Sequence, residues 1–145
     1  MTHKYRPVNT DLGLLIIRLT ACSSLFVRHG IEKLFHFDDM LEIFPDPLFI
    51  GKLPSLIFAL FTDGILSLFV LLGLFTRKSV VLIALNLTIA FFVFHNANLD
   101  GGEIAFVYLG VMILLFLCGP GKYSLDYMLY RKQQAKSKEG TENQQ

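Results

Sequence analysis

The chain has 145 residues, of which 53% are hydrophobic and 14 are phenylalanine, and its formal net charge is only +1. With a mean hydropathy of +0.53, it lacks the polar surface that a soluble domain of this length needs, so the composition excludes an ordinary soluble enzyme and predicts one integral membrane domain. The small net charge also excludes the strong basic field that would favour nucleic acid.

The first apolar stretch, at about residues 12–34, is long enough to span a bilayer. It nevertheless contains several ionisable side chains: Arg18, Arg28, His29, Glu32 and Lys33. At about 100° per residue on a helix, Arg18, His29 and Glu32 share one face, which we expect to look into a helical bundle. Charge within a membrane persists mainly where it is paired or lines a cavity, so this helix is expected to be the polar centre of the molecule.

An alternative for the same stretch is a lipoprotein signal, because residues 19–22 (Leu-Thr-Ala-Cys) resemble a cleavage box. A signal core should be apolar throughout, and here Asp11 and Arg18 interrupt it. A retained first span is therefore the favoured interpretation.

Residues 35–52 break the apolar pattern with acidic residues between hydrophobic ones. The apolar positions recur at helical spacing, which predicts a short helix lying in the outer membrane interface. Pro45 and Pro47 are expected to end it, since proline removes a backbone donor and restricts the residue before it.

Three further apolar stretches predict spans at about residues 54–75, 79–96 and 103–119. The turn at residues 76–78 is so short that the second and third spans should form an antiparallel hairpin. These spans bring a few polar side chains to meet the first: Asp63, Asn86, His95, Glu103 and Tyr108. The predicted fold is thus all-α, a four-transmembrane-helix bundle.

After the run Gly-Pro-Gly at residues 119–121, the sequence predicts an amphipathic interfacial helix with Ser124 as its cap. Residues 131–145 are polar and poor in hydrophobic side chains, so a disordered tail is expected there. The domain organisation predicted is therefore one membrane domain at residues 1–130, followed by the tail.

The lysines and arginines between the spans predict an orientation in the membrane. One side carries Lys4, Arg6, Arg77, Lys78, Lys122, Arg131, Lys132, Lys136 and Lys138. The other side has only Lys33 and Lys52. The positive-inside rule then places both termini in the cytoplasm and the protein in the inner cell membrane.

Comparing depths at 1.5 Å per residue places Asp63 within reach of a long side chain from the first helix. We therefore expect a charge-assisted pair between Asp63 and Arg18 or Arg28, with Asn86 near the level of Arg18. His29, Lys33, His95 and Glu103 would form the shallower part of this polar column. Two interpretations stay open: a packing device with water-facing histidines, or a proton-conducting or ligand-binding site. The histidines lack metal-ligand spacing, so no metal site is predicted.

The pattern as a whole resembles the DoxX family of four-helix membrane proteins, over residues 12–127. The matching pieces are Arg18; His29-Gly30 with Lys33-Leu34; GLFTR at residues 73–77; Ala90; Glu103 with Tyr108; and GPG followed by Ser-Leu-Asp at residues 119–126. Asp63 departs from the pattern, which usually has Glu there, and residues 21–23 are small where the family often has glycine.

The resemblance implies a component of a quinone-linked redox system or of an oxidant-defence complex. No motif for haem, flavin, nucleotide or an iron–sulfur cluster is visible, so electrons would need an external donor and a bound quinone. The expected partners are the lipid bilayer and redox proteins, with a homo-oligomer as a further option. Two alternatives remain: a binding or carrier protein for a small solute or lipid, and a structural subunit of a larger membrane complex.

Overall fold

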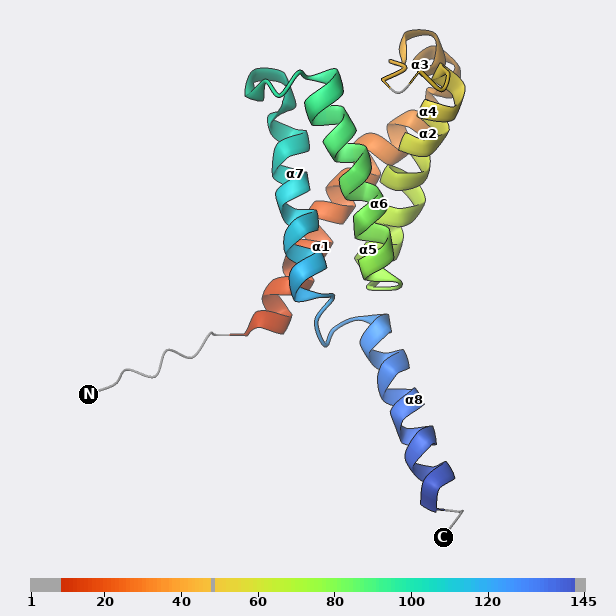
Figure 1. Cartoon of the computed structure of the whole chain (residues 1–145), viewed down its shortest axis with the longest axis vertical. Helices are drawn as coiled ribbons and strands as arrows, with labels where there is room; N and C mark the ends of the chain where they lie inside the picture. Colours follow the sequence, from red (N-terminus) through yellow and green to blue (C-terminus); the bar gives the residue numbers. More distant parts are fainter. Residues whose placement is uncertain (1–8, 48, 143–145) are drawn as a thin grey trace, which may run out of the picture.

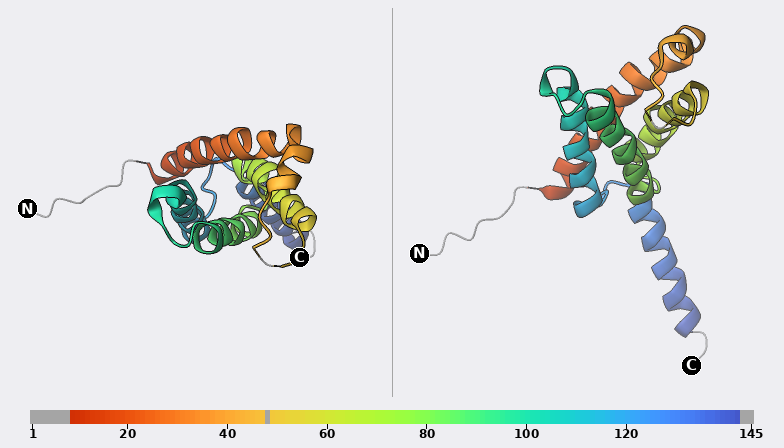
Figure 2. Two further views of the ribbon diagram at one scale, coloured as in Figure 1. Left: turned by 90° about the horizontal axis from the view of Figure 1, so that it is seen from above. Right: turned by 45° about the horizontal axis from the view of Figure 1, so that its top comes forward.

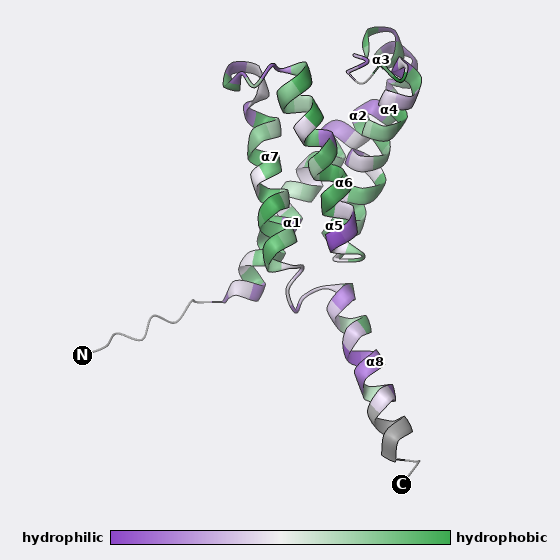
Figure 3. Cartoon of the chain, in the orientation of Figure 1, coloured by the Kyte–Doolittle hydropathy of each residue, from purple (hydrophilic) through white to green (hydrophobic). Residues whose placement is uncertain are grey.

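The computed structural model describes residues 9–47 and 49–142, and every regular element within them is helical (Figure 1). Four helical segments are long and apolar enough to cross a membrane: Thr10–Phe35, Lys52–Leu72, Thr76–Phe94 and Leu99–Cys118. Figure 3 shows hydrophobic residues along these spans and hydrophilic ones at the start of α6 and on α8. The predicted four-span all-α fold is confirmed.

Three of the four spans contain a π-helical segment. The first span is α1 (Thr10–Leu25), η1 (Phe26–Ile31) and α2 (Glu32–Phe35); the second is α4 (Lys52–Leu60), η2 (Phe61–Leu66) and α5 (Ser67–Leu72); the third is α6 (Thr76–Ile89) and η3 (Ala90–Phe94). The fourth span is the uninterrupted α7 (Leu99–Cys118). A π-helical turn holds one residue more than an α-helical turn, so later side chains are rotated by about 100° from their straight-helix positions.

Two shorter parts of the chain lie outside the spans. The predicted interfacial helix is α3 (Phe37–Ile43), which is followed by the turn at the two prolines. Helix α8 (Leu125–Glu142) follows the fourth span and points away from the bundle (Figures 1 and 2). Ser124 caps α8 by accepting a hydrogen bond from the backbone N–H of Tyr127 at 3.2 Å, as the sequence predicts.

The expected disorder from about residue 131 onward is not what the structure has, since α8 continues to Glu142. Glutamine, lysine, alanine and glutamate dominate this stretch and all have high helix propensity. Low hydrophobicity therefore excludes a buried helix here but not a solvated one. Residues 143–145 lie outside the described part of the chain.

The four spans form a ring when seen from above (Figure 2). We call the end where α1 begins and α7 ends the terminal end, and the opposite end, with α3 and the turn before α7, the loop end. In Figure 1, the α6–α7 pair separates from α2, α3 and α4 toward the loop end. The bundle is therefore closed at the terminal end and splayed at the loop end.

All four spans contribute to the core. Its buried members are Cys22, Leu25, Leu66, Val70, Val80, Ile83, Leu87, Met112 and Leu115. Most of those on the last three spans lie in the half of the span nearer the terminal end. In a bilayer such a core is stabilised by close packing rather than by transfer of apolar surface out of water.

Gly30 marks a close backbone contact between the first two spans. A Cβ atom there would lie 2.9 Å from the carbonyl oxygen of Asp63 and 2.9 Å from the Cα of Gly64. Only a residue without a side chain lets the two backbones approach this closely. The contact joins η1 to η2 and so fixes where the polar side chains of both segments lie.

Candidate functional site

A cavity of about 430 Å³ lies between the two splayed parts of the bundle at the loop end. Most of its walls are apolar side chains from α3, α4, α6, η3, α7 and the turn after α3. Its polar lining residues include His29, Lys33, Ser55, Asp63, Asn86, His95 and Tyr108. We call this space the loop-end cavity; its volume and mostly apolar walls are typical of small-molecule sites.

Asp63 and Lys33 form the charged part of this lining. The Lys33 Nζ lies 2.8 Å from Asp63 Oδ2, and the two side chains are only 11% and 6% exposed. Asn86 Nδ2 donates to Asp63 Oδ1 at 3.1 Å, and the Thr62 hydroxyl is 3.4 Å from the same oxygen. The carboxylate is therefore fully engaged, and the fixed charges of the cavity cancel.

Three other polar side chains of the cavity retain unused hydrogen-bonding capacity. Within the described part of the chain, the imidazoles of His29 and His95 and the hydroxyl of Tyr108 make no hydrogen bond. The three come from different spans: η1, the end of η3 and α7. Together they offer donors and acceptors to a bound polar group from three sides.

The predicted pair between Asp63 and Arg18 or Arg28 is wrong. Arg18 is fully buried, but its guanidinium donates to the carbonyls of Val70 and Leu71, each at 3.3 Å, and to the carbonyl of Tyr123. Arg28 is exposed. The carbonyls of the last helical turn have no partner within their helix and carry partial negative charge, so a helix end can take the place of a carboxylate.

Arg18 belongs to a second polar cluster at the terminal end, which we call the terminal joint: Arg18, Gly73, Ser124 and Asp126. Gly73 ends α5 at φ +71°, and a Cβ atom there would lie 2.4 Å from Arg18 Nη1. Asp126 accepts from the backbone N–H groups of Phe75 at 2.8 Å and Thr76 at 2.9 Å, while its own N–H donates to the Gly73 carbonyl. The joint ties α1, the hairpin and the start of α8 together.

Two further sequence expectations fail at the loop end. Glu32, expected to share the inward face with Arg18, is exposed. The cause is η1, which rotates the helix after Phe26 and turns Lys33 inward instead. Glu103 is also exposed and does not line the loop-end cavity, although Tyr108 on the same helix does.

The sequence analysis missed the contribution of residues 40–50 to the cavity. Met40, Ile43, Phe44, Pro45, Pro47 and Ile50 all line it. Asp46 holds this segment in place by accepting from the backbone N–H groups of Ile50 at 3.0 Å and Gly51 at 2.9 Å. The signal available in the sequence was the rigid Pro-Asp-Pro turn flanked by apolar residues, which an interfacial helix alone does not require.

Comparison with known proteins sets this arrangement in a family. The family model for DoxX matches residues 13–96, which include the first three spans and both charged partners of the cavity. The chain belongs to the DoxX family. The resemblance inferred from the sequence is thereby confirmed, and the protein is a multi-pass membrane protein of that family.

A relative of this DoxX protein is found in Haemophilus influenzae. It is 28% identical over 137 residues, covering 89% of this chain and 96% of the relative, and it is described as an uncharacterized protein. No solved structure matches the chain. The similarity therefore extends beyond the matched family region to nearly the whole chain, but it brings no activity with it.

Proposed function

We propose that this DoxX protein is a quinone-binding component of a membrane redox system, with the loop-end cavity as its binding site. The observation that carries the proposal is the combination of apolar walls, a neutralised ion pair and three unused hydrogen-bonding side chains in one cavity of about 430 Å³. A quinone head group is a flat, uncharged ring with two carbonyl acceptors. Its isoprenoid tail is apolar and suits a cavity set among membrane spans.

The charge of the site supports a neutral ligand. Lys33 and Asp63 compensate each other, and Asn86 satisfies a further lone pair of the carboxylate. A net charge on the ligand would have to be held without a counter-ion in a membrane interior, which costs several kcal/mol. An uncharged head that accepts hydrogen bonds from His29, His95 or Tyr108 avoids that cost.

A bound quinone would supply the two-electron, two-proton chemistry, with electrons coming from a redox partner protein. The role proposed for the chain's own residues is to bind the ring, orient it and handle protons. His29 and His95 are suited to relaying protons, because an imidazole can both donate and accept a hydrogen bond. Tyr108 would donate a hydrogen bond from its hydroxyl, and the Lys33–Asp63 pair would set the local field.

The test is quinone binding by the purified full chain in mild detergent. Bound quinone is extracted and quantified, and the affinity for a short-chain ubiquinone is measured by equilibrium dialysis. Removing one neutral hydrogen bond by His29→Phe or Tyr108→Phe should weaken binding by about two- to tenfold. His36→Phe is the matched control, because His36 lies at the same end but does not line the cavity. Equal affinity for all variants and wild type would sink the proposal.

The rival carrier function makes a different prediction for the same cavity. Vesicles containing the protein would then take up a small solute without any dependence on redox state. The redox role instead predicts that native membranes carrying Tyr108→Phe oxidise quinol at a different rate from wild-type membranes. The two kinds of membrane must contain the same amount of the protein.

We further propose that the protein resides in the inner cell membrane with both termini in the cytoplasm. The support is the distribution of lysines and arginines, which gather at the terminal end around the start of α6 and on α8. A C-terminal reporter that is active only in the cytoplasm should be active, whereas the same reporter inserted after residue 97 should be silent. The reverse pattern would overturn this orientation.

A further inference from the structure

A second hollow lies at the terminal end, outside the loop-end cavity. It has a volume of about 880 Å³ and lies between the turn before α6, the loop after α7 and the first turns of α8. Its lining residues are Asp11, Phe75, Thr76, Arg77, Lys78, Pro120, Gly121, Lys122, Asp126, Tyr127 and Tyr130. We call this space the terminal groove.

The two acids of the groove are already used inside the chain. Asp126 accepts from two backbone N–H groups at the start of α6. Asp11 accepts from the backbone N–H of Lys122 at 3.0 Å and pairs with the Lys122 ammonium at 3.3 Å. Both carboxylates are therefore already occupied by groups of the chain itself, in contacts that hold the fold together.

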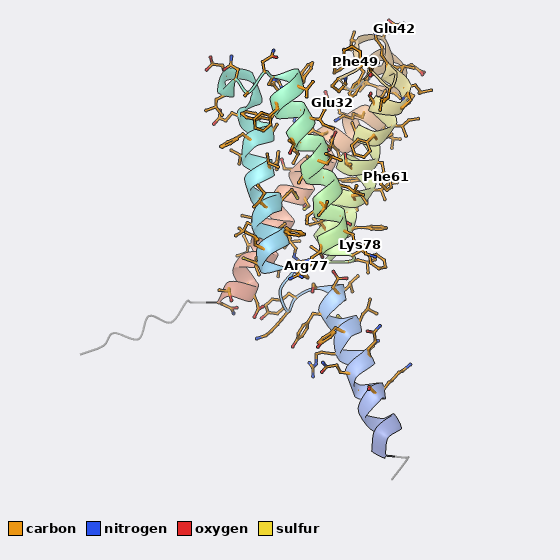
Figure 4. All side chains as sticks on the ribbon, viewed as in Figure 1. Glu32, Glu42, Phe49, Phe61, Arg77 and Lys78 are labelled. Atoms are coloured by element: carbon orange, nitrogen blue, oxygen red, sulfur yellow. The ribbon has the colours of Figure 1, made fainter. Side chains whose placement is uncertain are left out.

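Two cations of the groove have no such partner. Within the described part of the chain, Arg77 and Lys78 make no ion pair, and both are exposed at the bundle edge facing α8 (Figure 4). The Arg77 guanidinium reaches toward the loop after α7, lying 4.0 Å from where a Cβ on Gly119 would stand. Lys78 also lies 5.9 Å from the centre of the Phe75 ring, a contact that leaves its charge unneutralised. The groove thus has a net positive charge that no acid among the described side chains balances.

The wall of the groove also contains a polar group that the described residues leave unsatisfied. Thr76 lines the groove and is fully buried, and its hydroxyl finds no hydrogen-bond partner among the described residues. A buried hydroxyl left unsatisfied costs about 1–3 kcal/mol.

The position of the groove selects the ligand. Thr76 begins one span and Cys118 ends another, so the groove lies at the edge of the hydrocarbon layer, where lipid head groups are. Tyr127 and Tyr130 flank it, and tyrosine is enriched at this level of the membrane. We propose that the terminal groove binds the phosphate of an anionic phospholipid through Arg77 and Lys78. Basic pockets between membrane helices are known to hold such head groups.

The test uses the purified full chain in a neutral detergent, with phosphatidylglycerol or phosphatidylcholine added. Native mass spectrometry counts bound lipid, and thermal unfolding reports stabilisation. Phosphatidylglycerol should bind and raise the Tm, whereas phosphatidylcholine should not. Arg77→Gln with Lys78→Gln should weaken phosphatidylglycerol binding by about tenfold or more, because each basic residue contributes about 1 kcal/mol to attraction for anionic lipid.

The matched control is Lys132→Gln with Lys136→Gln, which removes the same charge from exposed positions of α8 outside the groove. It should bind phosphatidylglycerol as the wild type does. Without lipid both double variants should unfold near the wild-type temperature, and Lys78→Gln alone provides a milder variant should the pair fold poorly.

Three outcomes overturn the proposal. The first is unchanged lipid binding by the groove variants, and the second is an equal loss in the α8 control, which indicates only general surface charge. The third is equal stabilisation by inorganic phosphate, which indicates a soluble phosphate ligand rather than a lipid.

Discussion

The terminal joint and the loop-end cavity each hold a largely buried cation, but they satisfy it differently. Arg18 is surrounded by backbone carbonyls from the end of α5 and from the loop before α8. Lys33 meets the carboxylate of Asp63, a side chain on a π-helical segment that borders open space. One cation is fixed by the backbone, and the other by a side chain.

The difference separates a closely packed structural joint from a candidate ligand site. The joint fills its volume, since even one added carbon at Gly73 would overlap Arg18 and Ser124. The cavity instead leaves room beside its ion pair and keeps hydrogen-bonding side chains unused. A charged residue in a membrane span is thus no sufficient sign of a ligand site, because backbone carbonyls can accept most of its hydrogen bonds.

Replacing Arg18 should have the largest effect on stability. Arg18→Met removes three hydrogen bonds from a fully buried site, and only the Val70 carbonyl keeps another partner among the described residues, the Gly73 N–H. The free energy of unfolding should therefore fall by about 3 kcal/mol. Unfolding in mixed micelles, followed by circular dichroism, measures it. Arg28→Met on the same span is the control and should change little, because Arg28 is exposed. Equal losses in both variants would contradict the comparison.

Asp63→Asn should lower the free energy of unfolding by about 2 kcal/mol, because the largely buried Lys33 ammonium then has no anionic partner. Adding Lys33→Met should restore much of the loss, which a double-mutant cycle in the same unfolding assay can show. The restored double variant should still bind quinone less well than the wild type, if the pair also sets the field of the cavity. Full binding by that variant would reduce the pair to a packing device.

Gly30→Ala should destabilise the protein by about 1–2 kcal/mol, because its Cβ would lie 2.9 Å from the backbone of η2. Gly110→Ala offers a matched control, since nothing lies within 4 Å of a Cβ there and alanine favours the helix by up to about 1 kcal/mol. The two substitutions should therefore shift the Tm in opposite directions. A shift of the same sign would argue against the close contact of η1 and η2.

Asp126→Asn should have the smallest effect on stability, lowering the free energy of unfolding by about 1 kcal/mol. Asparagine retains one acceptor oxygen, so one of the two hydrogen bonds to the start of α6 and the charge beside that helix end are lost. Thermal unfolding in detergent would register this as a Tm decrease smaller than that of Arg18→Met. A larger decrease would place Asp126, rather than Arg18, at the centre of the joint.

Much of the fold and part of the site followed from simple patterns in the sequence. Apolar run length located the four spans to within a few residues, and the short turn at residues 76–78 required the hairpin. The sequence predicts Lys33, Asp63 and Asn86 in one polar column, with Lys33 at a shallower level, and in the structure Asp63 contacts both of the others. Depth arithmetic failed for Arg18 because it counted only carboxylates as partners and ignored the carbonyls of a helix end.

The order and length of the apolar runs by themselves determined that this chain is a four-span membrane protein with an ionisable first helix, because a bilayer admits few other arrangements of such runs. Only the tertiary structure decided which ionisable groups face one another. The physical reason is the π-helical segment in each of the first three spans, whose extra residue turns the rest of the helix by about 100°. That rotation brings Lys33 to Asp63 and Glu32 to the surface, and it depends on contacts between spans such as that of Gly30 with Gly64.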